Sequence, residues 1–102
     1  MKNKENLHTL IDNIERNQYE FRIDTFVPRI EYIKAKNNIY LTHTEVPREL
    51  ENKGIGSSMV RQVFSVIEQE DLTLIPLCPF VAMYIKRHPK WKKLVMKGID
   101  IV

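Results

Sequence analysis

In ELENKGIGSSM, residues 49–59, two glycines separated by one residue come just before a segment with helical spacing. After it, apolar side chains fall on one stripe, which predicts an amphipathic helix of about four turns: Ile55, Met59, Val60, Val63, Phe64 and Ile67. A glycine turn before a helix gathers free backbone N–H groups at the positive end of the helix dipole. The stretch predicts either an anion site, with phosphate as the natural occupant, or a tight turn that needs positive φ at Gly54 or Gly56.

The residues before this stretch predict a mainly antiparallel sheet. Apolar and polar residues alternate over 19–24, which is typical of a strand with one buried face. Residues 29–36 and 38–46 are rich in Ile, Tyr, Thr and Val, and the pair Asn37-Asn38 suits a tight turn between them. We expect a hairpin that ends at Pro47, which lacks a backbone donor.

The first residues allow two interpretations. Leu7, Leu10, Ile11 and Ile14 have helical spacing, but residues 16–18 could instead turn a hairpin between two strands. We favour the strands.

The second half of the chain predicts a further strand and a short helix. Residues 72–80 form a mostly apolar run suited to a central strand, in which Pro76 and Pro79 each remove a ladder donor. Strand pairing must therefore fail somewhere along this run. We expect a short helix over 81–87, and a weakly specified final strand or tail over 93–102.

Composition indicates one globular domain over residues 1–102. The chain is 43% hydrophobic and 28% charged, as in ordinary folded proteins. It has no apolar run of the roughly 20 residues that a membrane span needs, and its start, MKNKENLHTL, has no apolar signal segment. Cys78 is the single cysteine, which excludes an intrachain disulfide and zinc-finger spacing. We therefore expect a cytoplasmic protein with neither membrane nor metal.

Positive charge is concentrated late in the sequence. Between Leu72 and Ile99 there are six Lys or Arg residues and no Asp or Glu. Such a run is a solvated face, a nucleic-acid surface or a site for a phosphorylated cofactor.

Two common phosphate loops do not fit the glycine turn. A dinucleotide fingerprint needs Gly or Ala where Met59 stands. A triphosphate loop needs Gly-Lys-Ser/Thr where the chain has Met59-Val60-Arg61.

A third phosphate-binding pattern fits better. His43-Thr44-Glu45-Val46-Pro47, Lys53-Gly54-Ile55-Gly56 and Ile75-Pro76-Leu77-Cys78-Pro79-Phe80, followed by Arg87-His88-Pro89, lie in this order. Together they resemble the small, single-domain members of the GNAT superfamily of acyl-coenzyme A-dependent N-acetyltransferases. The resemblance covers roughly residues 41–95. One departure is Glu51, which stands where the superfamily loop has Arg or Gln.

The resemblance implies an α+β fold, with a mixed, mainly antiparallel sheet, a central helix after the fourth strand and a short helix after the fifth. It implies that the sheet opens between these two strands to hold the thioester, an opening for which Pro76 gives a physical reason. It also implies a set of coenzyme-binding residues: Val46, whose backbone N–H would face the thioester carbonyl, the backbone amides of Lys53, Gly54, Ile55, Gly56, Ser57 and Ser58, and the hydroxyls of the two serines.

Acetyl transfer to an amine also needs a base and an exit for the thiolate. His43 and Glu45 are the candidate bases, and strand alternation places them on one side, bordering the opening; either could be purely structural. Cys78 falls where this subfamily has a cysteine. It could be a nucleophile, a proton donor to the leaving thiolate or a small buried residue. Trp91 and its basic neighbours could hold the coenzyme's adenine and phosphates or simply pack.

We therefore expect an acetyl-coenzyme A-dependent N-acetyltransferase whose partners are acetyl-coenzyme A and an amine, either a small molecule or a protein. The alternatives are an acyl-coenzyme A-binding module without turnover and a basic nucleic-acid-binding domain. The sequence leaves the oligomeric state open, and a monomer is compatible with it.

Overall fold

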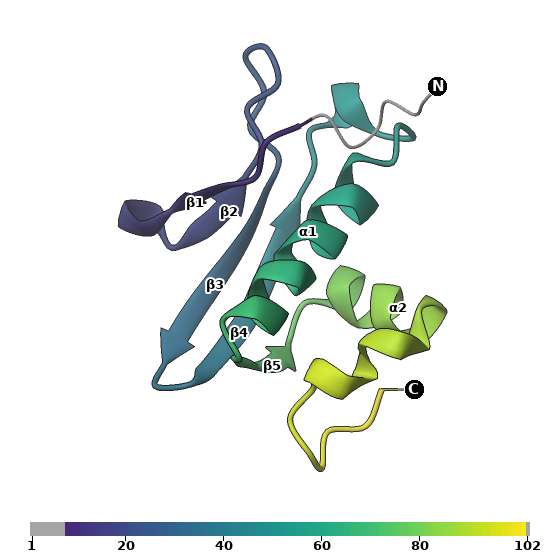
Figure 1. Ribbon diagram of the computed structural model, residues 1–102. Coiled ribbons are helices and arrows are strands. Elements are labelled where there is room, and N and C mark those ends of the chain that lie inside the picture. Colours follow the sequence, from purple (N-terminus) through teal and green to yellow (C-terminus); the bar gives the residue numbers. More distant parts are fainter. Residues whose placement is uncertain (1–7, 102) are drawn as a thin grey trace.

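The computed structural model describes residues 8–101 of the chain. Its centre is a five-stranded sheet in the order β1-β2-β3-β4-β5. Neighbouring strands run antiparallel from β1 to β4, whereas β4 and β5 are parallel. The predicted mixed, mainly antiparallel sheet is confirmed, with a helix after the fourth strand and a short one after the fifth (Figure 1). The elements are β1 Ile11–Asn13, β2 Gln18–Glu20, β3 Arg29–Ala35, β4 Asn38–Glu45, α1 Ile55–Gln69, β5 Thr73–Pro76 and α2 Pro79–Arg87, with 3-10 turns at Ile14–Arg16, Arg48–Leu50 and Pro89–Leu94.

The first two strands form the hairpin that we favoured over a helix. A 3-10 turn joins them and ends at Asn17, which has φ 54°. The turn is held by the Asn13 side chain, whose Oδ1 accepts a hydrogen bond from the Arg16 N–H at 3.3 Å. Leu7, part of the helical alternative, lies outside the described residues.

The strand predicted over 19–24 is shorter than expected. β2 ends at Glu20, and the chain then turns through Asp24, which has φ 54°. The alternation is also wrong at Glu20, which is only 3% exposed. Its carboxylate is buried because Asn13, Gln18 and Arg22 all donate hydrogen bonds to it.

The second hairpin is confirmed, but its turn is shifted by one residue. Ala35 pairs with Asn38, so Lys36 and Asn37 form the turn. The residue in the left-handed region is Lys36, with φ 60°, and not one of the predicted Asn pair. β4 ends before Pro47, as expected.

Helix α1 lies across one face of the sheet, which we call the inner face (Figure 1). All six predicted apolar positions of the helix are buried, and they pack against side chains such as Ile30, Ile39 and Leu41. Each fully buried Val, Ile or Phe side chain stabilises the fold by about 1.5–3 kcal/mol. This core fixes the first turn of α1 beside the end of β4.

The strand predicted over 72–80 is also shorter than expected. β5 ends at Pro76, and Pro79 is the first residue of α2, a position that suits proline because its missing N–H would have no helical partner. The helix therefore begins two residues before the predicted range of 81–87. The expected final strand is reduced to one bridge from Val95 to Leu74. Within residues 8–101, no helix has the length and apolar character to cross a membrane.

Candidate active site

The sheet opens between β4 and β5, as the resemblance implied. The two strands pair from Asn38 and Thr73 to Leu41 and Pro76. Beyond Pro76 the chain turns, and the N–H groups of Leu77 and Cys78 both donate to the Leu41 carbonyl, at 3.1 and 3.0 Å. β4 continues to residue 45 without a strand partner on that side among the described residues. We call this opening the β4–β5 gap.

A β-bulge in β4 decides which side chains face the gap from each side. Glu31 pairs with His43 and the next residue, Tyr32, pairs with Leu41, so Thr42 is an extra residue. The Thr42 hydroxyl closes the bulge by donating to the Glu31 carbonyl at 3.2 Å. Because side chains alternate along a strand, one extra residue reverses the faces of everything after it.

The bulge turns Thr44 to the inner face. Thr44 pairs with the fully buried Ile30, and residues directly opposite each other share a face. From across the gap, the Cys78 thiol donates a hydrogen bond to the Thr44 hydroxyl, with 3.2 Å between Sγ and Oγ1. Cys78 is only 4% exposed. The structure thus brings Cys78 together with a threonine that the sequence analysis did not select.

The same bulge turns His43 and Glu45 to the opposite, outer face, where their partners are Glu31 and Arg29. The two side chains lie on one side, as predicted, and they also contact each other: His43 Nε2 lies 3.1 Å from Glu45 Oε1, and both side chains are about half exposed. They border the gap on the side away from α1. Neither meets Cys78, so a catalytic role for them stays a prediction.

The two glycines of the turn serve different purposes. Gly54 has φ 75°, in the left-handed region that side chains disfavour, and a Cβ there would meet nothing within 4 Å. Gly56 is needed for space, because a Cβ there would lie 2.8 Å from Phe80 Cζ and 3.5 Å from Val46 Cγ2. Positive φ was expected at Gly54 or Gly56, and the structure has it at Gly54.

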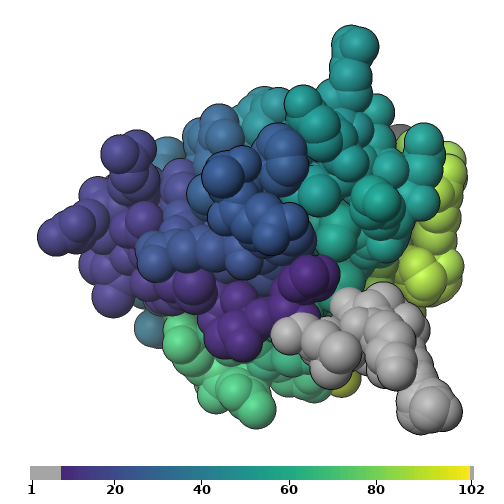
Figure 2. Space-filling view, turned by 90° about the horizontal axis from the view of Figure 1, so that it is seen from above, coloured from purple at the N-terminus to yellow at the C-terminus, as the bar shows by residue number. Residues whose placement is uncertain are grey.

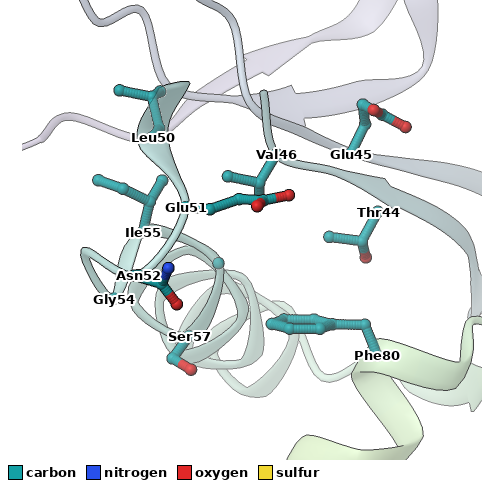
Figure 3. A pocket seen from close by; sticks show the side chains of 11 residues that line it. Thr44, Glu45, Val46, Leu50, Glu51, Asn52, Gly54, Ile55, Ser57 and Phe80 are labelled. Carbon is teal, nitrogen blue, oxygen red and sulfur yellow. The ribbon is translucent and has the colours of Figure 1, made fainter. Parts of the chain in front are cut away.

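A pocket of about 430 Å³ lies between the end of β4, the first turn of α1 and Phe80 (Figure 3). In the close-up, Thr44 points towards Phe80 and Glu45 points away from the pocket. From above, the teal segment that runs from β4 into α1 is exposed between the blue strands and the yellow-green C-terminal part (Figure 2). The lining residues are Thr44, Glu45, Val46, Leu50, Glu51, Asn52, Gly54, Ile55, Gly56, Ser57 and Phe80.

Five of the seven predicted coenzyme-binding residues line this pocket, and two do not. Val46, Gly54, Ile55, Gly56 and Ser57 contribute to its wall. Lys53 is exposed outside the lining. Ser58 is buried, and its Oγ accepts a hydrogen bond from Gln62 Nε2 at 3.3 Å.

The pocket suits a phosphate through its backbone and opposes it through its side chains. The first intrahelical bond of α1 runs from Ser58 N to Gly54 O, so the N–H groups of residues 55–57 are free of helical partners. The side chain missing at Gly56 keeps this end open. Against this, Glu45 and Glu51 line the pocket and no Lys or Arg does. The free backbone N–H groups at the start of α1 therefore fit a coenzyme's pyrophosphate, whereas the Glu51 carboxylate would repel it.

The basic segment and Trp91 stand apart from this pocket. Trp91 is buried, with its ring centroid 5.4 Å from that of Phe64, so it packs in the core and offers no open stacking surface. Lys90 and Lys93 lie over its ring, and Lys93 also pairs with Glu68 at 2.6 Å.

The fold and the gap have the arrangement expected of a GNAT acyltransferase. The family model for GCN5-related N-acetyl-transferases matches residues 18–94, a span that includes the gap, the glycine turn and Cys78. The chain therefore belongs to the GCN5-related N-acetyltransferase family, which places it among the acyltransferases. No curated protein matches the sequence. Within residues 8–101 no group of three or more His, Cys, Asp or Glu side chains could hold a metal ion.

Proposed function

We propose that this protein transfers an acetyl group from acetyl-coenzyme A to a primary amine across the β4–β5 gap. The observation that carries the proposal is the opening itself, because Cys78 and Thr44 approach it from the inner face and His43 and Glu45 from the outer face. Acetyl-coenzyme A supplies an activated acyl group as a thioester. The acceptor amine then approaches the gap from the outer face of the sheet, opposite the coenzyme.

On the inner face, the chain's part is to bind the pyrophosphate and place the acyl group in the gap. Free N–H groups in the first turn of α1 attract the pyrophosphate, helped by the helix dipole. Val46, Ile55 and Phe80 supply apolar walls beside it. In this proposal the Val46 N–H donates to the thioester carbonyl.

Cys78 takes part in the transfer in this proposal. It is the N-cap of α2, and its thiol donates a hydrogen bond to the Thr44 hydroxyl. As a nucleophile, Cys78 Sγ would bond to the acyl carbon while the thioester C–S bond breaks, and the thiol proton would pass to the departing coenzyme A sulfur. The amine would then attack the acyl carbon and displace Sγ, which would take up the proton that the amine loses. As a proton donor, Cys78 would only give its thiol proton to the departing thiolate.

On the outer face, His43 and Glu45 prepare the acceptor. An alkylammonium with a pKa of about 10 must lose a proton before it can attack a carbonyl. His43 is the side-chain type suited to accept that proton, and Glu45 orients its ring through the 3.1 Å contact. Both are exposed, so they can meet an amine that arrives from solvent.

Thermal unfolding with acetyl-coenzyme A, coenzyme A, NADH and a short duplex DNA tests the binding step. A ligand at 100 times its Kd stabilises by about 2.7 kcal/mol, and each kcal/mol is worth roughly 4–8 °C in a domain of this size. We expect shifts with the two coenzymes alone and their loss in Gly56→Trp. Ser65→Trp, at an exposed position of the same helix, is the matched control and should keep the shifts. A shift with DNA alone would favour the nucleic-acid alternative.

Turnover of acetyl-coenzyme A with an amine panel tests the transfer step. Cys78→Ser and Cys78→Ala should both lose activity if the thiol reacts. An acetyl adduct on the intact wild-type protein would identify a nucleophile, whereas activity loss without an adduct would identify a proton donor. If the coenzymes stabilise the protein but no amine is acetylated, the proposal fails in favour of a binding module.

A further inference from the structure

The outer face of the sheet has a second hollow, of about 610 Å³, that the transfer chemistry above does not use. It lies over β1, β2 and β3, on the face away from α1. Eight side chains line it, and most of them are polar or charged: Asn13, Arg16, Gln18, Glu20, Arg22, Val27, Arg29 and Glu31.

The hollow holds three guanidinium groups against two carboxylates. Arg22 binds the buried Glu20 at 2.8 Å, and Arg29 binds Glu31 at 2.7 Å. Within residues 8–101, no Asp or Glu forms an ion pair with Arg16. Burial by itself would raise the pKa of Glu20, but hydrogen bonds from Gln18, Arg22 and Asn13 hold it below its ordinary value, so Glu20 remains charged and keeps Arg22 in place.

Fixed pairs of this kind prepare the arginines to bind an anion. Each guanidinium has five N–H donors in a planar fork, and a carboxylate neighbour occupies only some of them. Arg29 uses Nε for Glu31, which leaves its terminal nitrogens for another acceptor. With Arg16 added, the hollow has a net positive charge of one.

The strand register connects the hollow to the gap. Glu20 pairs with Arg29, and Arg29 pairs in turn with Glu45. In the adjacent row, Glu31 pairs with His43. Adjacent strands lie about 4.8 Å apart. Arg29 therefore lies one strand spacing, about 5 Å, from Glu45, which borders the gap, and Arg16 lines the same hollow beyond the paired strands.

On the outer face of the sheet, the gap and the hollow attract groups of opposite charge. At the gap, the Glu45 carboxylate attracts an ammonium group, and His43 stands beside it to accept the proton. In the hollow, the excess of guanidinium attracts an anion. We propose, on the basis of the proposed function, that the acceptor is a zwitterion: a primary amine with a carboxylate about 5–10 Å away that binds Arg29, with Arg16 adding positive charge in the same hollow.

Three probes of one length test this proposal: 6-aminohexanoate, its amide and 1,6-diaminohexane. With acetyl-coenzyme A, we expect kcat/KM for the carboxylate to exceed that for the other two by about tenfold, the effect of one charge-assisted contact. Arg16→Gln should remove most of this preference through KM and leave the KM for acetyl-coenzyme A unchanged. Arg48→Gln, an exposed arginine outside both hollows, is the matched control and should keep the preference.

A binding titration keeps this test separate from the fate of the proposed function. Without coenzyme, 6-aminohexanoate should shift the backbone amide signals of residues 16–31 in the wild type, and much less in Arg16→Gln. That result supports the zwitterion site even if no acetyl transfer occurs. Equal or better use of 1,6-diaminohexane, an unchanged preference in Arg16→Gln, or no amide shift at millimolar concentration would overturn it.

Discussion

Gly56→Ala is predicted to raise stability in a Phe80→Ala background but not in the wild type. The added methyl would lie 2.8 Å from Phe80 Cζ and 3.1 Å from Cε2, well inside the 3.5–4.0 Å or so that carbon atoms prefer. Such crowding costs about 1–3 kcal/mol. The cost should be at the low end, because the Phe80 ring is 42% exposed and can swing away. Against it stands a gain of up to about 1 kcal/mol from replacing glycine in a helix.

We therefore expect Gly56→Ala alone to leave stability unchanged or to lower it by up to about 1 kcal/mol. In a Phe80→Ala background the clash is gone, and the same change should raise stability by about 0.5–1 kcal/mol. Urea unfolding of the four proteins measures the difference, which is a coupling of about 1 kcal/mol between the two positions. Equal effects of Gly56→Ala in both backgrounds would refute the argument that the glycine exists to admit the ring.

Three further substitutions test separate parts of the account. Gly54→Ala forces a side chain into φ 75° and should cost about 1–2 kcal/mol, read as a fall in Tm. Glu20 has a lowered pKa in the fold, so its stabilising effect is present above the ordinary carboxyl pKa and is lost as the pH falls through the folded pKa. The free energy of unfolding of Glu20→Gln, measured at a series of pH values, should therefore fall less steeply towards acid pH than that of the wild type. Glu51→Gln should tighten coenzyme binding about two- to fivefold at low salt by calorimetry, and an effect that salt does not weaken would contradict a Coulombic cause.

The elements with strong local patterns could be predicted from the sequence. Helix α1 has an apolar stripe repeated over its whole length, and the β3–β4 hairpin has β-branched strands and a polar turn. The errors fall where one local signal competes with another. Pro79 was assigned to a strand because the run around it is apolar, but proline is also a favoured first residue of a helix.

The candidate site was predictable only in part, because its faces depend on one bulged residue. Strand alternation places His43 and Glu45 on the same side, and the structure confirms this. The extra residue, Thr42, leaves no mark in the pattern of residue types, so the inner-face partner of Cys78 could not be predicted. Phe80 could not be predicted as a pocket residue either, because its contact with Gly56 joins two helices that are distant in sequence. Glu20 gave no signal either, because its burial depends on three hydrogen-bond donors around it.

An amide NMR titration of the ¹⁵N-labelled protein with acetyl-coenzyme A would locate the acyl group relative to the β4–β5 gap. We expect the largest shifts in residues 54–57, where α1 begins, and in residues 44–46, where β4 ends beside the gap. We also expect smaller shifts for free coenzyme A near Thr44 and Cys78, because the acetyl group is missing there. Shifts confined to residues 86–97, or none at millimolar coenzyme, would contradict the placement of acyl transfer in the β4–β5 gap.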